Sequence, residues 1–295
     1  MQVVEHGGFS AAAQKLYMSQ PSVSNQVRQL ERSVRAPLID RSGPRIRPTA
    51  EGEVLLEYGK RVFLLAGEAV AAIRQVGELE SGRLAIGGTT TVGTYLLPSL
   101  LAEFRSRHPL VECDIYVGNN VQVRGRLLDG ELGVAVVAGE PGAPQLASEP
   151  ILADRLVLIA APGHRLAGQC LLPQALTGER FLLREQGSQT RDLQEAALLQ
   201  WEIQQVRRAE VWGPEAIKQC VAVGLGLSLI SEHAVVDEVQ SGRLAVLQVD
   251  PPLKRRPISV VHRRDRLLSP AERAFIALLH EVHDWPSELP RVRPA

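Results

Sequence analysis

Residues 10–49 read SAAAQKLYMSQPSVSNQVRQLERSVRAPLIDRSGPRIRPT, and this stretch decides the fold of the first part of the chain. Residues 11–13 are three alanines, which favour a helix and let a second helix pack closely against it. Ser19 has the character of an N-cap, and Pro21 would lie in the first turn of the next helix, where its missing N–H costs little. The stretch therefore predicts two short helices separated by a tight turn.

The second of these helices is predicted to have one apolar and one polar face. Val23, Val27 and Leu30 recur at helical spacing and are expected to face the core. The opposite face is rich in amides and hydroxyls, whereas an ordinary surface helix favours Glu and Lys. Such a face suits the reading of base edges in the major groove of DNA. The residues expected to contact DNA from this helix are Gln20, Pro21, Ser22, Ser24, Asn25 and Arg28.

A basic turn follows the second helix. Residues 41–47 read RSGPRIR, with a Gly-Pro tip and arginines that alternate with Ile46, as in the wing of a hairpin. Arg41, Arg45 and Arg47 are therefore expected to contact phosphates. A purely structural helical hairpin with a solvated polar face is the alternative to DNA binding.

The distribution of charge favours DNA binding. The chain of 295 residues balances 33 basic against 33 acidic residues, so its net charge carries no information. Residues 1–49, however, hold seven basic and three acidic residues, and the remainder is net acidic. A small basic module on a larger acidic body is typical of a nucleic-acid-binding protein with a separate control domain.

These motifs resemble the winged helix-turn-helix of LysR-type transcriptional regulators, and the resemblance extends over nearly the whole chain. Its most specific parts are SQPSVS at residues 19–24, Leu30-Glu31, and PTAEG at residues 48–52. The resemblance implies a winged helix-turn-helix over residues 1–49, with a truncated first helix because the chain begins within it. One departure is Asn25, where family members commonly carry arginine; an asparagine side chain suits adenine better than guanine.

Residues 50–80 are predicted to form a long linker helix. Its apolar residues alternate at steps of three and four, which is the seam of a coiled coil. On a monomer this seam would be an exposed apolar stripe, so we expect a dimerisation helix that uses Leu55, Tyr58, Val62 and Leu65. A long helix packed on its own domain is the alternative. The resemblance implies a homodimer or homotetramer whose recognition helices bind an interrupted palindrome in double-stranded DNA.

Strands and helices alternate through residues 81–285, which predicts a doubly wound α/β fold with parallel sheets. Apolar strands are expected at residues 133–138 and 156–160, with helices at 95–107 and near 171–176. The resemblance implies a two-lobed effector-binding domain, built like a periplasmic binding protein. The predicted boundaries are lobe I at 81–151 and 257–285, lobe II at 152–256, and a tail at 286–295.

Two loops are candidates for binding a small molecule. In such sheets ligands lie beyond the carboxyl ends of strands, beside the N-termini of helices. One loop offers Thr89, Thr90 and Thr91; the other offers Gly187, Ser188, Thr190 and Arg191. Hydroxyls, backbone N–H groups and an arginine suit a small anion. Ordinary helix-capping loops without a ligand are the alternative.

Other functions find little support in the sequence. His280 and His283 lack a third ligand nearby, the three cysteines share no metal-binding spacing, and no catalytic motif is present. We therefore expect no enzyme, no metal and no cofactor. The N-terminal residues do not resemble a signal peptide and no apolar run approaches a membrane span, so a cytoplasmic location is expected.

The resemblance as a whole implies a transcription factor that responds to a small anionic effector and contacts RNA polymerase. The run that begins at Gly213 resembles family members that regulate carbon fixation and inorganic-carbon uptake. The alternative from another class is a two-lobed small-molecule-binding protein or enzyme with a vestigial, non-functional DNA-binding head.

Overall fold

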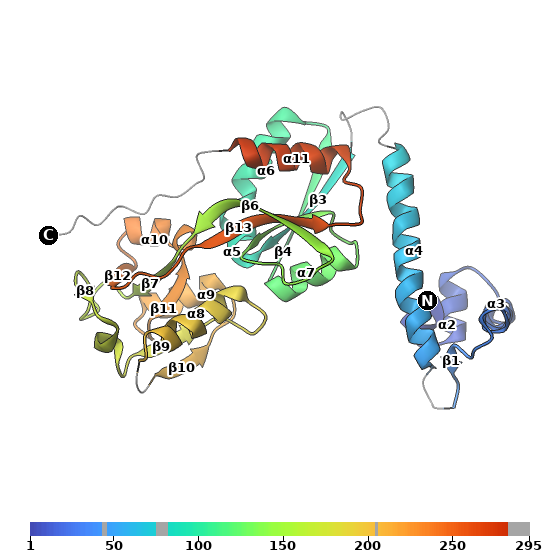
Figure 1. Ribbon diagram of the computed structural model, residues 1–295, viewed down its shortest axis with the longest axis horizontal. Helices are drawn as coiled ribbons and strands as arrows, with labels where there is room; N and C mark the ends of the chain where they lie inside the picture. Colours follow the sequence, from blue (N-terminus) through green and yellow to red (C-terminus); the bar gives the residue numbers. More distant parts are fainter. Residues whose placement is uncertain (43–45, 75–81, 204–205, 283–295) are drawn as a thin grey trace. The chain divides into compact units, whose positions relative to one another are not determined.

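The computed structural model describes residues 1–42, 46–74, 82–203 and 206–282 (Figure 1). The chain divides into two compact units, residues 1–74 and residues 75–295.

The first unit is a small helical domain with a two-stranded hairpin and a long final helix. Its elements are α1 (Gln2–Glu5), α2 (Phe9–Lys15), α3 (Gln20–Val34), β1 (Ile39–Asp40), β2 (Arg47–Pro48) and α4 (Ala50–Arg74). β1 and β2 pair antiparallel. The core consists of Val3, Ala12, Ala13 and Val23. Because alanine has a small side chain, α2 and α3 can pack closely.

The turn between α2 and α3 has the predicted chemistry. Ser19 is the N-cap of α3, and its Oγ accepts a hydrogen bond from the backbone N–H of Ser22 at 3.3 Å. Pro21 lies in the first turn of α3, and Tyr17 adopts a left-handed conformation with φ of 53° in the turn. The prediction that Leu30 faces the core was wrong, because this side chain is 45% exposed. α2 has 7 residues and α3 has 15, so α2 is too short to cover the second half of α3.

The start of α4 is fixed against the loop that precedes β1. Thr49 Oγ1 donates a hydrogen bond to the Pro37 carbonyl at 2.6 Å and accepts one from the Gly52 N–H at 3.0 Å. A Cβ atom at Gly52 would lie 2.1 Å from the Leu38 carbonyl oxygen, so only glycine fits at this contact. The PTAEG motif thus joins the hairpin to α4.

The second unit contains two α/β lobes, each built on its own mixed sheet. The first lobe has a five-stranded sheet in the order β4-β3-β5-β13-β6, and the second has a four-stranded sheet in the order β11-β7-β12-β8 with a separate β10-β9 pair. The strands of the first lobe are β3 (Gly82–Thr89), β4 (Val111–Gly118), β5 (Val134–Ala138), β6 (Leu146–Asp154) and β13 (Arg256–Arg263). Those of the second lobe are β7 (Leu156–Ala160), β8 (Cys170–Leu171), β9 (Arg180–Leu183), β10 (Arg207–Glu210), β11 (Ser228–Ser231) and β12 (Ala245–Val249).

Helices cover both faces of each sheet, so the expectation of a doubly wound α/β architecture is confirmed. In the first lobe α5 (Thr90–Tyr95), α6 (Leu97–Arg107) and α11 (Pro270–Glu281) pack on one face and α7 (Asn120–Leu128) packs on the other. In the second lobe α8 (Gln189–Gln200) and η1 (Pro173–Leu176) contribute to one apolar cluster. The other cluster contains residues of α9 (Pro214–Ala222), η2 (Glu232–Ala234) and α10 (Val236–Gln240).

Several details of the second unit differ from the predictions. β3, β4 and β5 are parallel, but β13 runs antiparallel to both β5 and β6, so the sheet is not parallel throughout. The helix predicted over residues 95–107 is α6 (Leu97–Arg107), whereas Thr90 and Thr91, predicted to lie in a loop, begin the short helix α5. Residues 171–176 hold the end of β8 and a short 3-10 helix. β6 was missed, because its sequence LASEPILAD neither alternates cleanly nor forms an apolar run.

Candidate DNA-binding surface and lobe interface

The polar face of α3 is accessible. Gln20, Pro21, Ser22, Asn25 and Arg28 are exposed, and Ser24 is half-buried. The amides and hydroxyls predicted to read bases therefore share one helix and are open to a partner. Within the described part of the chain, Arg28 forms no ion pair. This face can offer hydrogen bonds to base edges and one unneutralised positive charge to phosphate.

Glu31 joins the hairpin to α3. Its Oε1 accepts hydrogen bonds from the backbone N–H groups of Leu38 at 3.0 Å and Ile39 at 3.3 Å. Its Oε2 forms an ion pair with Arg41 at 3.4 Å, and the Arg41 guanidinium lies 5.1 Å from the centre of the Phe9 ring. Arg41 and Arg47 are both exposed, and Arg45 lies outside the described residues. The carboxylate of Glu31 thus fixes the wing relative to α3.

The sequence interpretation did not include two further arginines among the candidate DNA-binding residues, Arg32 on α3 and Arg35 at its C-cap. Arg32 and Arg35 line a hollow of about 370 Å³ together with Arg28. Their spacing of four and three residues places all three on one side of the helix, and this spacing could have identified them. The hollow adds positive charge beside the predicted base-reading face.

The predicted dimerisation residues lie along α4. Tyr58, Val62 and Leu65 are 59%, 64% and 61% exposed, whereas Leu55 is half-buried. An apolar stripe of this kind is unusual on the surface of a monomer.

Both loops predicted to bind a ligand lie at the interface between the lobes. Thr90 Oγ1 donates a hydrogen bond to the Gly118 carbonyl at 3.2 Å and accepts one from Arg184 Nη2 at 3.3 Å. Thr89 Oγ1 accepts from the Ala138 N–H at 3.0 Å, and Thr91 is buried. Thr90 is thus the threonine of this loop that bonds to the second lobe.

Arg184 is a central residue of the interface that sequence reasoning missed. Its side chain is 2% exposed, and its Nε and Nη2 atoms donate to the Glu185 carboxylate at 2.8 and 2.7 Å. Burial raises the pKa of Glu185, but the hydrogen bonds and charge of Arg184 outweigh it, and the pKa lies below its ordinary value. The sequence could have identified Arg184, because it directly follows an apolar strand and a buried arginine needs a partner of opposite charge.

The second predicted loop begins α8. Ser188 is the buried N-cap of this helix, and Thr190 Oγ1 accepts a hydrogen bond from Arg256 Nη1 at 3.1 Å. Arg191 binds within its own lobe, where its Nε donates to Glu195 at 2.8 Å and its Nη1 donates to the Arg184 carbonyl at 2.8 Å. The charge of Arg191 is therefore largely compensated.

A set of backbone and amide contacts also joins the lobes. The Val121 N–H donates to the Gly187 carbonyl at 3.3 Å, and the Gln189 N–H donates to Asn120 Oδ1 at 3.2 Å. A Cβ atom at Gly139 would lie 1.4 Å from Gln189 Oε1 and would displace that amide, and the φ of 87° at this position also favours glycine. The start of α7 and the start of α8 thus lie against each other.

A polar cluster links α5 of the first lobe to α9 of the second. The Tyr95 hydroxyl donates to Glu215 Oε1, and Lys218 Nζ lies 2.9 Å from Glu215 and 4.9 Å from the centre of the Tyr95 ring. Burial, followed by the hydrogen bond and charge of Glu215, raises the pKa of Tyr95. Burial raises the pKa of Glu215, yet its bonds to Tyr95 and Lys218 lower it overall. Tyr95 therefore stays a neutral donor to a charged acceptor.

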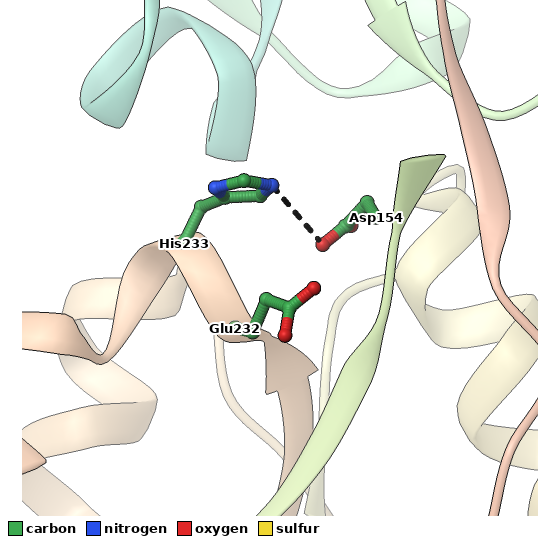
Figure 2. Close-up of side chains that lie close together, drawn as sticks. All are labelled: Asp154, Glu232 and His233. Carbon is green, nitrogen blue, oxygen red and sulfur yellow. Dashed lines mark ion pairs between the residues drawn. The ribbon is translucent and has the colours of Figure 1, made fainter. Parts of the chain in front are cut away.

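Asp154, Glu232 and His233 come together where β6 ends (Figure 2). His233 Nε2 lies 3.9 Å from Asp154 Oδ1. Asp154 Oδ2, however, already binds Arg256 at 2.8 and 2.7 Å, and Glu232 binds Arg155 at 2.9 Å. Because an arginine occupies each carboxylate, this donor set suits an ion-pair network better than a metal ion.

The comparisons with known proteins cover both units. Residues 1–53 match the model of the bacterial regulatory helix-turn-helix protein of the lysR family, and residues 77–284 match the LysR substrate binding domain. The chain belongs to the LysR family. It is a LysR-type DNA-binding transcriptional regulator with a domain for a small-molecule effector, and not an enzyme. Among the described helices, none is both long and apolar enough to cross a membrane.

The individual relatives of this LysR regulator agree with the carbon-fixation hint in its sequence. A probable RuBisCO transcriptional regulator of Trichormus variabilis is 33% identical over 280 residues, which is 92% of this chain and 83% of the relative. The CcmR regulatory domain of Synechocystis, solved in complex with 2-PG, is 32% identical with a TM-score of 0.64 and covers 68% of this chain and 97% of its own. The full-length structure of CbnR with its target DNA matches the fold with a TM-score of 0.65, covering 95% of this chain and 96% of its own at 23% identity.

Proposed function

We propose that this LysR regulator binds an interrupted palindrome in double-stranded DNA through α3 and the wing, as a homodimer or homotetramer. The exposed polar face of α3 and the exposed apolar stripe of α4 support the proposal. The proposed organisation is a winged helix-turn-helix at 1–49, a linker helix at 50–80, an effector-binding domain at 81–285 and a tail at 286–295. Within the effector-binding domain, residues 81–151 and 257–285 would form lobe I, and residues 152–256 would form lobe II.

The effector is proposed to be a small anion held between the lobes. The observation that carries this proposal is the hydrogen bond from Arg184 to Thr90, because it joins one predicted loop to the strand that leads into the other. Both loops also begin helices, α5 and α8, and helix N-termini favour anions. The hydroxyls of Thr91 and Ser188 lie in the same loops, whereas the Thr89 hydroxyl already binds the Ala138 N–H and Arg191 is already paired with Glu195. Since the similar CcmR domain was solved with 2-PG, 2-PG is the first probe to test.

Binding of the anion is proposed to change the angle between the lobes. The change would pass through the oligomer to the spacing of the DNA-binding heads, and so to DNA bending and contact with RNA polymerase in the cytoplasm. Such coupling requires the anion to bind one arrangement of the lobes more tightly than the other.

Calorimetric titration of the full chain with 2-PG tests the effector site. Ser188→Ala and Thr91→Ala should weaken 2-PG binding about tenfold, because each removes a hydroxyl available to an anion. Ser241→Ala is the matched control, since the hydrogen bonds of Ser241 Oγ in the described structure are to Asp237, Glu238 and Arg243, at the end of α10 and away from both loops. DNA affinity without 2-PG should be unchanged in all three variants. A parallel loss of 2-PG binding and basal DNA binding would contradict the separation of the two roles.

A further inference from the structure

The second lobe contains a pocket of about 570 Å³ that belongs to neither predicted site. It is lined by β7, β12 and the end of α8. None of its described lining residues belongs to residues 89–91 or 187–191. Its volume falls within the range of small-molecule sites in proteins, about 300–1,000 Å³. Most of its wall is hydrocarbon, from Leu156, Leu158, Leu229, Leu247, Val249 and Leu253.

Two buried hydrogen-bond donors in this wall lack an acceptor. Trp201 is 4% exposed, and its indole Nε1 has no hydrogen-bond partner among the described residues. The same holds for Nε of Arg155, although its Nη2 binds Glu232 at 2.9 Å. Buried donors without partners are rare in folded proteins, because each has lost its water without compensation. An acceptor oxygen on a bound molecule would supply the partner that the indole N–H of Trp201 lacks.

The charges around the pocket disfavour the binding of an anion. The positive charge of Arg155 is already paired with Glu232, and the exposed carboxylate of Asp250 also lines the pocket. A carboxylate or phosphate here would face Asp250 without a free cation among the described lining residues. An uncharged acceptor, such as a carbonyl oxygen, avoids this repulsion.

We propose that this pocket is a second ligand site, which binds a small uncharged molecule with a hydrocarbon body and one carbonyl oxygen. The hydrocarbon body packs on the leucine and valine walls, and the carbonyl oxygen accepts from the indole N–H of Trp201. This site is chemically distinct from the proposed anion site between the lobes.

Calorimetric titration of the full chain with 2-octanone tests the proposal, with octanoate as the charged counterpart of similar length. Trp201→Phe keeps an aromatic ring and removes the donor, so 2-octanone should bind about three- to tenfold more weakly. Leu253→Trp fills a half-buried part of the pocket and should abolish binding. Trp212→Phe is the control, because Trp212 is exposed and does not line the pocket. Thermal melting confirms that each variant is folded.

A second measurement locates the bound molecule without a mutation. Cys170 lines the pocket and is exposed, whereas Cys113 and Cys220 are half-buried elsewhere. Saturating 2-octanone should slow alkylation of Cys170, read peptide by peptide by mass spectrometry, and leave the other two cysteines unaffected. The proposal is overturned if 2-octanone does not bind, if Leu253→Trp binds it as the wild type does, or if Cys170 is not protected. Octanoate binding as tightly as 2-octanone would overturn the assignment to uncharged ligands.

Discussion

The hydroxyl of Tyr95, on α5 of the first lobe, donates a hydrogen bond to the carboxylate of Glu215, on α9 of the second lobe. Lys218 Nζ lies 2.9 Å from the same carboxylate and 2.9 Å from that of Glu238. A neutral donor thus binds a carboxylate whose position is already fixed by a buried lysine. The Tyr95 hydroxyl thus contributes one of several hydrogen bonds between the two lobes.

Tyr95→Phe removes that hydroxyl and keeps the ring over Lys218. If the bond favours the arrangement of the lobes that binds the effector, 2-PG affinity should fall about three- to tenfold. The measurement is calorimetric titration of the full chain. Tyr116→Phe is the control, because the Tyr116 hydroxyl has no hydrogen bond among the described residues. Equal 2-PG affinity in Tyr95→Phe and the wild type would show that this contact does not affect the binding arrangement.

Glu185→Gln should destabilise the second unit by about 3 kcal/mol at pH 7, because it leaves the buried Arg184 without a counter-charge. The pKa of Glu185 is lowered in the folded protein, so its stabilising contribution is present above its ordinary pKa and is lost as the pH falls through the folded value. The difference in unfolding free energy between wild type and variant should therefore shrink when urea denaturation is repeated at pH 4 and below. A difference that is independent of pH would mean that the carboxylate charge is not the cause.

Gly52→Ala should destabilise the first unit by about 1–3 kcal/mol, because the new Cβ would lie 2.1 Å from the Leu38 carbonyl oxygen. Gly67→Ala is a matched control on the same helix, since a Cβ there meets no described atom within 4 Å. Alanine at that position should instead stabilise α4 by about 0.5–1 kcal/mol. Thermal melting distinguishes the two changes. Similar melting temperatures for the two variants would refute the close approach at Gly52.

Val62→Glu places a charge in the middle of the apolar stripe on α4. If this stripe is the dimer interface, the variant should be monomeric at concentrations at which the wild type is a dimer or tetramer. Sedimentation equilibrium measures the association state directly. Lys60→Glu introduces the same side chain away from the predicted seam and should leave association unchanged. An associated Val62→Glu variant would show that the oligomer forms through other surfaces.

The sequence predicted those parts of the structure that depend on local spacing. Ser19 and Pro21 mark the start of α3 through short-range capping chemistry, and the predicted ligand-binding residues 89–91 and 187–191 lie at the junctions of β3 with α5 and of β9 with α8. Contacts between distant residues were not predictable in this way. Arg184 and Thr90 are separated by 94 positions, and the pairing of β6 with β13 joins residues more than 100 positions apart. Such contacts depend on tertiary packing, which cannot be predicted from the local periodicity of the sequence.

The central claim is that α3 and the wing read DNA while an anion between the lobes modulates the complex. The most direct test measures binding of the full chain to a duplex with an interrupted palindrome and to a scrambled duplex, at two salt concentrations, with and without 2-PG. We expect tighter binding to the palindrome, a steep loss of affinity with salt, and a change on adding 2-PG that Ser188→Ala suppresses. Equal, weak binding to both duplexes that is insensitive to 2-PG would contradict it.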